Sequence, residues 1–177
     1  DTVAIGLRKG IVADVNIDVE KKEYQNIDTV TLYLNPKRQE EYYNYIIDLK
    51  PIVSLENLVT FESENLKNVK DWSILKDCIQ LEGLGINGDM YQVLKLNTLD
   101  FIKDLKNLKY LFLINVDIEN KSLLPIEKLK GLECLRLSNR WTEDQFKRLN
   151  EALPKLKYGN PTNSETKERL KSRSFFI

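Results

Sequence analysis

The hydrophobic pattern is most regular between Leu105 and Leu137, where one leucine spacing occurs twice, 24 positions apart. In the first copy the apolar residues fill positions one, four, six, nine and eleven of an eleven-residue pattern: Leu108, Leu111, Leu113, Val116 and Ile118. The second copy repeats the first three with Leu132, Leu135 and Leu137. Apolar residues that alternate with other residues at positions four and six are typical of a short strand with one buried face. The repetition predicts units that stack side by side, because one such unit cannot bury its apolar face alone.

Weaker copies of the pattern precede and follow these two. They place the first position of successive repeats at Ile27, Leu58, Cys78, Leu108, Leu132 and Leu153. The irregular spacing predicts returns of unequal length, some helical and some loops. The register stays open between Leu55 and Leu94, where Gly83 to Asp89 (GLGINGD) is predicted to be a turn-rich insertion. The ninth position holds Asn only in the first copy, at Asn35.

Four segments between the predicted strands have the apolar spacing of helices or short turns: residues 38–49, 98–105, 122–129 and the helix from Thr142 to about Leu153. Pro51 is expected to close the first of them, Thr98 to cap the second, and Thr142 to Gln145 form a capping box for the last. That last helix should bury Phe146 and Leu149 and lead into a final strand.

The two ends of the chain differ from the repeats. Residues 1–26 are expected to be an N-terminal cap, with a strand at Val3, Ile5 and Leu7, a turn at Lys9-Gly10 and a returning strand over 11–19. Such a hairpin would shield the open edge of the first repeat. Residues 27–160 are assigned to the repeats, and 161–177 to a C-terminal capping helix or tail that ends in Phe175-Phe176-Ile177.

The stretch from Leu108 to Leu137 resembles the leucine-rich repeat superfamily, and the likeness extends weakly from Ile27 to Tyr158. The ending from Phe146 to Lys157 is similar to repeats of the ribonuclease-inhibitor-like type, and the Lys-, Asn- and Ile-rich composition is similar to that of bacterial proteins. The resemblance implies an α/β leucine-rich-repeat solenoid with a curved parallel sheet, helical or loop returns and an N-terminal β-hairpin cap. It also implies that partners bind on the concave face of the sheet, and it implies no catalytic residue.

Composition narrows the function. Lys and Arg together number 27, and Asp and Glu together also number 27, so no basic excess favours nucleic acid as the main partner. The chain has no histidine, which removes histidine-based triads and zinc sites and makes catalysis less expected. Cys78 and Cys134 are too few for a disulfide framework and are expected to be reduced, with Cys78 in the core and Cys134 facing outward. We expect no cofactor, no metal and no membrane span.

The repeat register predicts which side chains the sheet presents to a partner, because successive residues of a strand point to opposite faces. A bulky apolar group is expected at the centre, on the fourth strand, with acidic residues on one side and basic residues on the other. The predicted partner-binding residues are Tyr33, Glu62, Glu64, Glu82, Tyr110, Phe112, Ile114, Arg136 and Lys157. The same register turns Gln80 and Leu84 outward with Glu82 on the third strand, and Lys155 and Gly159 with Lys157 on the last.

These observations favour a non-enzymatic module that binds a protein partner, in the narrower form an inhibitor or toxin-immunity protein of a bacterium. The alternative is an exported cell-surface or adhesion-type structural repeat protein. For the apolar group on the fourth strand another interpretation stays open: the chain itself covers this group, either with Gly83 to Gln92 or with the C-terminal tail. The identity of the partner and the oligomeric state stay open, as does the compartment: the cytoplasm, which we favour, or export with a removed signal.

Overall fold

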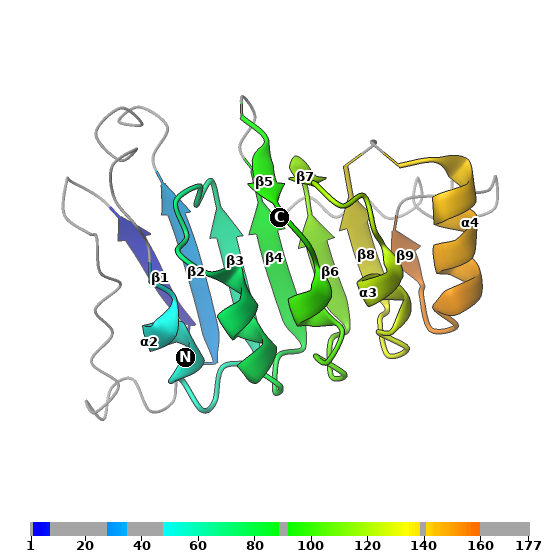
Figure 1. Ribbon diagram of the computed structural model, residues 1–177. Helices are drawn as coiled ribbons and strands as arrows, with labels where there is room; N and C mark the ends of the chain where they lie inside the picture. The colour runs from blue at the N-terminus through cyan, green and yellow to red at the C-terminus, as the bar shows by residue number, and fades with distance from the viewer. Residues whose placement is uncertain (1, 8–27, 35–47, 89–91, 139–140, 160–177) are drawn as a thin grey trace.

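In the part of the chain that the structure describes, seven strands form one parallel sheet, in the order β1-β2-β3-β4-β6-β8-β9 (Figure 1). The computed structural model describes residues 2–7, 28–34, 48–88, 92–138 and 141–159. The strands are β1 (Thr2–Leu7), β2 (Thr29–Leu34), β3 (Thr60–Glu64), β4 (Gly83–Asn87), β6 (Tyr110–Leu113), β8 (Cys134–Leu137) and β9 (Tyr158–Gly159). Their order in the sheet is their order in the chain, with β5 and β7 left out, as stacking of consecutive coils requires.

The returns that the structure describes lie on one side of the sheet, in front of it in Figure 1. They are the four-residue helices α2 (Lys50–Val53) and α3 (Leu124–Glu127), the 3-10 segments η3 (Trp72–Asp77) and η4 (Asp100–Ile102), and the ten-residue helix α4 (Glu143–Ala152). We call the opposite side of the sheet the open face. A second parallel pair, β5 (Leu94–Leu96) with β7 (Val116–Ile118), lies beyond the ends of β4 and β6.

The strand register fixes the repeat. Tyr110 pairs with Gly83 on one side and with Cys134 on the other, and Cys134 pairs with Tyr158. Each of these residues therefore holds the third position of its repeat. From β3 onward the first positions are Leu58, Leu81, Leu108, Leu132 and Leu156, with spacings of 23, 27, 24 and 24 residues. The two strong copies are confirmed as neighbouring parallel strands, and the repeats are more even than the sequence suggested.

Two predicted registers are wrong by three residues. The third repeat begins at Leu81 and not at Cys78, and the last begins at Leu156 and not at Leu153. As a result Leu84 is buried instead of facing outward, and Gly83 to Asn87 is strand β4 instead of an insertion. The cause is a buried residue three positions before each first position, whose carbonyl accepts a bond from the first-position N–H at 2.9–3.1 Å. These turn residues are Leu55, Cys78, Leu105, Leu129 and Leu153.

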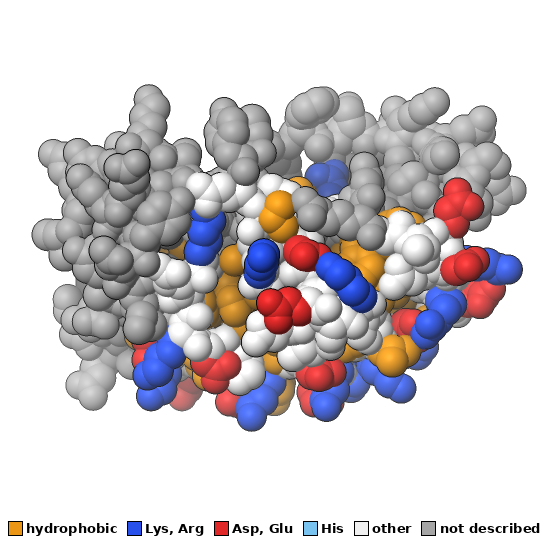
Figure 2. All heavy atoms as spheres, turned by 45° about the horizontal axis from the view of Figure 1, so that its top comes forward, with side chains coloured by type: hydrophobic (Ala, Val, Ile, Leu, Met, Phe, Trp, Pro, Cys, Tyr) orange, Lys and Arg blue, Asp and Glu red, His pale blue; other side chains and the backbone are white. Residues whose placement is uncertain are grey.

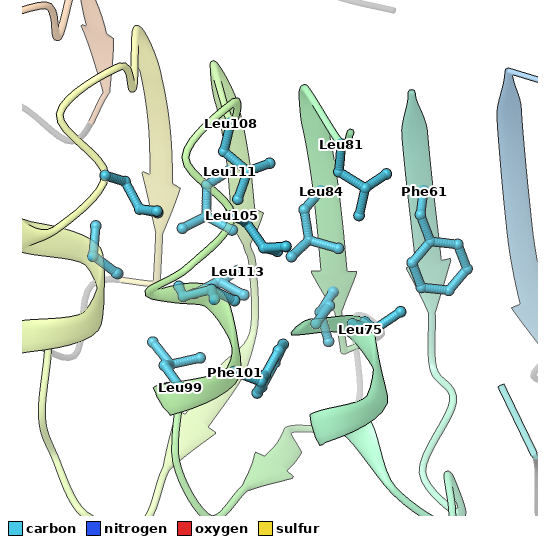
Figure 3. Packing of buried hydrophobic residues seen from close by; sticks show 14 of the residues in the cluster. Phe61, Leu75, Leu81, Leu84, Leu99, Phe101, Leu105, Leu108, Leu111 and Leu113 are labelled. Carbon is cyan, nitrogen blue, oxygen red and sulfur yellow. The ribbon is translucent and has the colours of Figure 1, made fainter. Parts of the chain in front are cut away.

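The core fills the space between the sheet and the returns. Figure 3 shows Phe61, Leu84 and Leu111, from three neighbouring strands, on the same side of the sheet as Leu75 and Leu99 of the returns. All five side chains are buried, and each contributes about 1.5–3 kcal/mol by leaving water. Position six is also buried in β2, β3, β4, β6 and β8. In β3 this residue is Ser63, whose hydroxyl donates to the carbonyl of Gly85 at 3.3 Å.

The returns match the predicted ones in part. The capping box is present, since Thr142 accepts from the N–H of Gln145 and Gln145 accepts from the N–H of Thr142. Pro51 lies in the first turn of α2, and most of the helix that it was predicted to close is outside the described residues. The predicted helix over 98–105 is only the short η4. Bonds of the i to i+3 kind, such as Ile102 N–H to the Leu99 carbonyl at 3.0 Å, explain why these turns stay tight.

Of the predicted terminal caps, only strand β1 lies within the described residues. Strand β1 exists and pairs with β2 in parallel, so it extends the repeat sheet as its first strand. The turn and returning strand of the predicted hairpin lie outside the described residues, as do the greater part of the predicted 38–49 helix and the C-terminal segment 161–177. None of the helices in the described ranges is long and apolar enough to cross a membrane.

Candidate functional site

The open face carries the side chains at positions three, five and seven of each strand. On β6 these are Tyr110, Phe112 and Ile114, as predicted. Tyr110 is 45% exposed and Ile114 is 44% exposed, while Phe112 between them is half-buried. Most large apolar side chains of the described ranges are buried, so a consecutive apolar group on one strand is a distinct surface feature. We call these three residues the β6 patch.

The β6 patch has a cation on one side. Arg136 of β8 pairs with Phe112 in the register, and its guanidinium carbon lies 5.7 Å from the centre of the Phe112 ring. That distance is within the range of a cation–π contact, which holds the guanidinium over the ring. Cys134 pairs with Tyr110 and is half-buried, so it faces outward as predicted. Burial raises the pKa of the Cys134 thiol, and nearby Arg136 offsets part of this effect.

On the other side of the patch, β4 presents two glycines. Gly83 pairs with Tyr110 and Gly85 pairs with Phe112, so these open-face positions carry no side chain. The neighbouring residues of β3 lean into the space. A Cβ atom on Gly83 would lie 3.1 Å from Cγ2 of Thr60, and one on Gly85 would lie 2.9 Å from Cγ of Glu62. The glycines therefore let Thr60 and Glu62 lie across β4, toward the β6 patch.

The acidic side of the open face consists of Glu62 and Glu64. Glu64 is exposed at the end of β3 and pairs with Asn87 in the register. The amide of Asn87 donates to Oε1 of Glu62 at 3.4 Å, and its carbonyl oxygen accepts from the N–H of Ile114 at 3.0 Å. Asn87 thus links the acidic side to the β6 patch, which sequence reasoning missed because the predicted register did not bring Asn87 to this face.

Two predicted site residues lie elsewhere. Glu82 and Lys157 hold position two, one residue before the open-face positions begin. The Nζ atom of Lys109 lies 2.7 Å from Oε2 of Glu82, and that of Lys157 lies 2.7 Å from Oε2 of Glu133. These residues belong to a row of alternating charge along the start of the strands and not to the open face. Tyr33 pairs with Glu64 in the register, and its side chain is outside the described part.

The row of charge shifts the pKa of two of its members, Lys109 and Glu133. The hydrogen bond to Glu82 raises the pKa of Lys109, and the hydrogen bond from Lys157 lowers the pKa of Glu133. Backbone bonds follow the same row: the carbonyl of Glu82 accepts from Lys109 and Tyr110, and the carbonyl of Lys109 accepts from Glu133 and Cys134, at 2.8–3.0 Å. The pairs therefore connect coils that the backbone already joins.

The return side is different in character. Figure 2 shows side chains of both charge signs interspersed along its lower rim, as on an ordinary solvated surface. A pocket of about 190 Å³ lies between the loop after β7 and helix α4. Two cations line it, but Arg148 contacts Glu127 at 2.8 Å and Lys121 contacts Asp117. Within the described ranges, no three His, Cys, Asp or Glu side chains gather to hold a metal ion.

The repeated leucines, their parallel register and the one-sided returns define the architecture as a leucine-rich-repeat solenoid. No protein-family model matches the chain, and no curated protein matches it. Among solved structures it is similar to an internalin from Listeria monocytogenes str. 4b F2365, at 18% sequence identity and a TM-score of 0.39. That match covers 64% of this chain and 38% of the internalin chain. The ribonuclease-inhibitor-like type stays a prediction.

Proposed function

We propose that this chain is a non-enzymatic protein-binding module that holds a protein partner on its open face. The observation that carries the proposal is the β6 patch, in which Tyr110 and Ile114 are exposed on either side of Phe112. Aromatic and aliphatic side chains that cluster on a surface lose water when a partner covers them, and such residues supply a large part of the binding energy at protein interfaces.

The charges beside the patch support the same proposal. Glu62 and Glu64 lie on one side of the patch and Arg136 on the other, so a bound partner would meet opposite charges at its two ends. Complementary charge at the edge of an apolar contact chiefly fixes orientation and speeds association. The arrangement favours one orientation of the partner.

In its narrower form, the proposal is that the partner is a bacterial protein that this chain inhibits, such as a toxin against which it confers immunity. This form requires a stable complex of fixed stoichiometry and loss of the partner's activity within it. Size-exclusion chromatography of the purified pair with light scattering tests the first requirement. An activity assay of the partner with and without this chain tests the second.

The test of the general proposal is capture from lysate of the source organism, followed by mass spectrometry. The test variant is Y110S/I114S, which removes the two exposed side chains and leaves half-buried Phe112 in place. The matched control is I79S/L124S, which removes apolar side chains that are 62% and 53% exposed at other sites. Both variants should fold, because exposed positions contribute little to the core.

The expected result is a protein that the wild-type chain and the I79S/L124S variant both retain and the Y110S/I114S variant loses. Circular dichroism and thermal melting of the three proteins should agree within a few degrees. Equal capture by both variants would reject the open face as the binding surface.

A further inference from the structure

The row at position five crosses the middle of the open face. Its members from β3 to β8 are Glu62, Gly85, Phe112 and Arg136, joined by the strand register. Neighbouring strands lie about 4.8 Å apart, so the backbones of Glu62 and Phe112 are separated by about 10 Å with only a glycine between them. A carboxylate, an aromatic ring and a guanidinium therefore follow one another along a single line.

Glu62 reaches into the gap that the glycine leaves. A Cβ atom on Gly85 would lie 2.9 Å from Cγ, 3.4 Å from Cβ and 3.4 Å from Cδ of Glu62, so the whole side chain lies against the glycine backbone. The carboxylate is thereby carried toward β6. On the far side of the ring, Arg136 holds its place over Phe112. On the β4 side of Phe112 the register position is Gly85, which carries no side chain.

The carboxylates of the open face differ from those at the start of the strands. Glu82 and Glu133 each contact a lysine at 2.7 Å, and Glu127 contacts Arg148 at 2.8 Å. In the part of the chain that the structure describes, Glu62 has only the amide of Asn87 at 3.4 Å, and Glu64 forms no ion pair. The open face thus presents acidic groups whose charge no described cation neutralises.

We propose that the meeting point of Glu62 and Phe112, above Gly85, is a subsite for a lysine or arginine side chain of the protein partner. The inference rests on the proposed function and adds the chemistry of the partner's central residue. The carboxylate supplies an ion pair, and the ring supplies a second attractive surface for the same cation. Tyr110 and Ile114 then contact apolar residues on either side, so the segment recognised is a basic residue flanked by apolar ones.

The probe is a set of capped tripeptides, acetyl-Leu-Arg-Leu-amide and the same peptide with citrulline in place of arginine. Citrulline keeps the shape of arginine and removes its charge. Binding to the full ¹⁵N-labelled chain is followed by the amide signals of Gly83 and Gly85, which lie directly under the proposed subsite. We expect saturable shifts of both signals with the arginine peptide, at a dissociation constant about fivefold below that of the citrulline peptide.

The variant that tests the carboxylate is E62Q, and its matched control is E56Q, which changes an exposed carboxylate in the turn before β3. The fivefold preference for arginine should disappear in E62Q and persist in E56Q. A second variant, G85A, should also reduce the preference, because the added methyl displaces Glu62 from β4. Preserved melting temperatures in all three variants keep the comparison interpretable.

Equal binding of the arginine and citrulline peptides would overturn the inference and leave the proposed function standing, since the apolar contacts alone would then suffice. Absence of shifts at Gly83 and Gly85 with the arginine peptide would also overturn it. Two further results would overturn it. Shifts of these signals in the variant K167S/R169S/K171S/R173S without peptide would indicate that the chain's own tail occupies the subsite. Shifts that depend on protein concentration would indicate that a second copy of the chain occupies it.

Discussion

The Nζ atom of Lys109 lies 2.7 Å from Oε2 of Glu82, and the two residues stand one position before the paired strands β6 and β4. The same contact occurs between Lys157 and Glu133, which stand one position before the paired strands β9 and β8. From β4 to β9 the residues before the strands thus alternate in charge from coil to coil, whereas uncharged Val59 holds this place before β3. In a solenoid each coil contacts chiefly its neighbours, so this row helps to fix which coils lie side by side.

The row should make stability depend on pH at both extremes. The pKa of Glu133 is lowered, so its contribution is present above its ordinary value of 4.5 and is lost as the pH falls through the lower value in the folded chain. The pKa of Lys109 is raised, so its contribution is present below 10.5 and is lost as the pH rises through the higher folded value. Urea unfolding of E133Q and wild type should differ at pH 7 and converge in acid.

Charge reversal tests whether the pairs act across coils. The single variant E82K places two cations together and should be less stable than wild type. The double variant E82K/K109E restores opposite charges across this pair and should recover part of the loss, because the introduced carboxylate at position 109 also faces Glu133. The two exposed side chains make both effects modest and reduced by salt. A double variant no more stable than E82K at low salt would contradict the pairing.

The register shows what the sequence could predict and what it could not. The fourth and fifth repeats could be placed because their leucines at positions one, four and six are complete. The third and last could not, because Cys78 and Leu153 are turn residues three positions before the true starts at Leu81 and Leu156. The turn residue, the first position and the fourth position of a repeat follow one another at intervals of three positions. A search for the leucine spacing can therefore place the start of a repeat three positions too early. Only strand pairing resolves that ambiguity.

Replacement of Leu84 by alanine tests the corrected register directly. Leu84 pairs with Leu111 and is buried, so L84A should lower the free energy of unfolding by about 2–5 kcal/mol. The control is Ile79, an exposed residue of the turn before β4, and I79A should change the free energy of unfolding by about 0.5 kcal/mol or less. Urea titration monitored by circular dichroism measures both. A neutral L84A would restore the outward orientation that the sequence alone predicted.

The candidate site was predictable only where one strand sufficed. Tyr110, Phe112 and Ile114 follow from alternation within β6, so the apolar centre could be placed from sequence. The glycines of β4 and the bridge through Asn87 depend on the register of a degenerate repeat, in which two of the three open-face residues lack a side chain. The same error moved Glu82 and Lys157 onto the open face, although both pair at the start of the strands.

Gly88 is predicted to tolerate no side chain. A Cβ atom there would lie 2.3 Å from the carbonyl oxygen of Asn115 and 2.7 Å from that of Gln92, and neither backbone atom can move cheaply. G88A should therefore destabilise the fold by about 1–3 kcal/mol or more. The control is G131A, whose new methyl would lie at an ordinary contact distance of 3.4 Å from the carbonyl oxygen of Lys106. Thermal melting should separate the two, and equal melting temperatures would contradict the close approach.

The two cysteines should react at very different rates with a thiol reagent. Burial raises the pKa of Cys78 to about 11, so at pH 8 only about one molecule in a thousand carries the reactive thiolate, in a fully buried side chain. Cys134 is half-buried on the open face, so it should react first in the native protein, with Cys78 following on unfolding. Ellman's reagent should show one native phase, absent from C134S, and a second phase in urea.

Because Cys134 pairs with Tyr110 in the strand register, it also reports on occupation of the open face. A partner bound at the β6 patch should slow modification of Cys134 in proportion to the fraction of the chain in complex, without changing the urea-dependent phase of Cys78. Conversely, prior alkylation of Cys134 with a bulky maleimide should weaken capture of the partner, because the adduct stands beside Tyr110. Serine at position 134 provides the control that removes the adduct without crowding the face. Undiminished capture by the alkylated chain would indicate that the partner binds elsewhere.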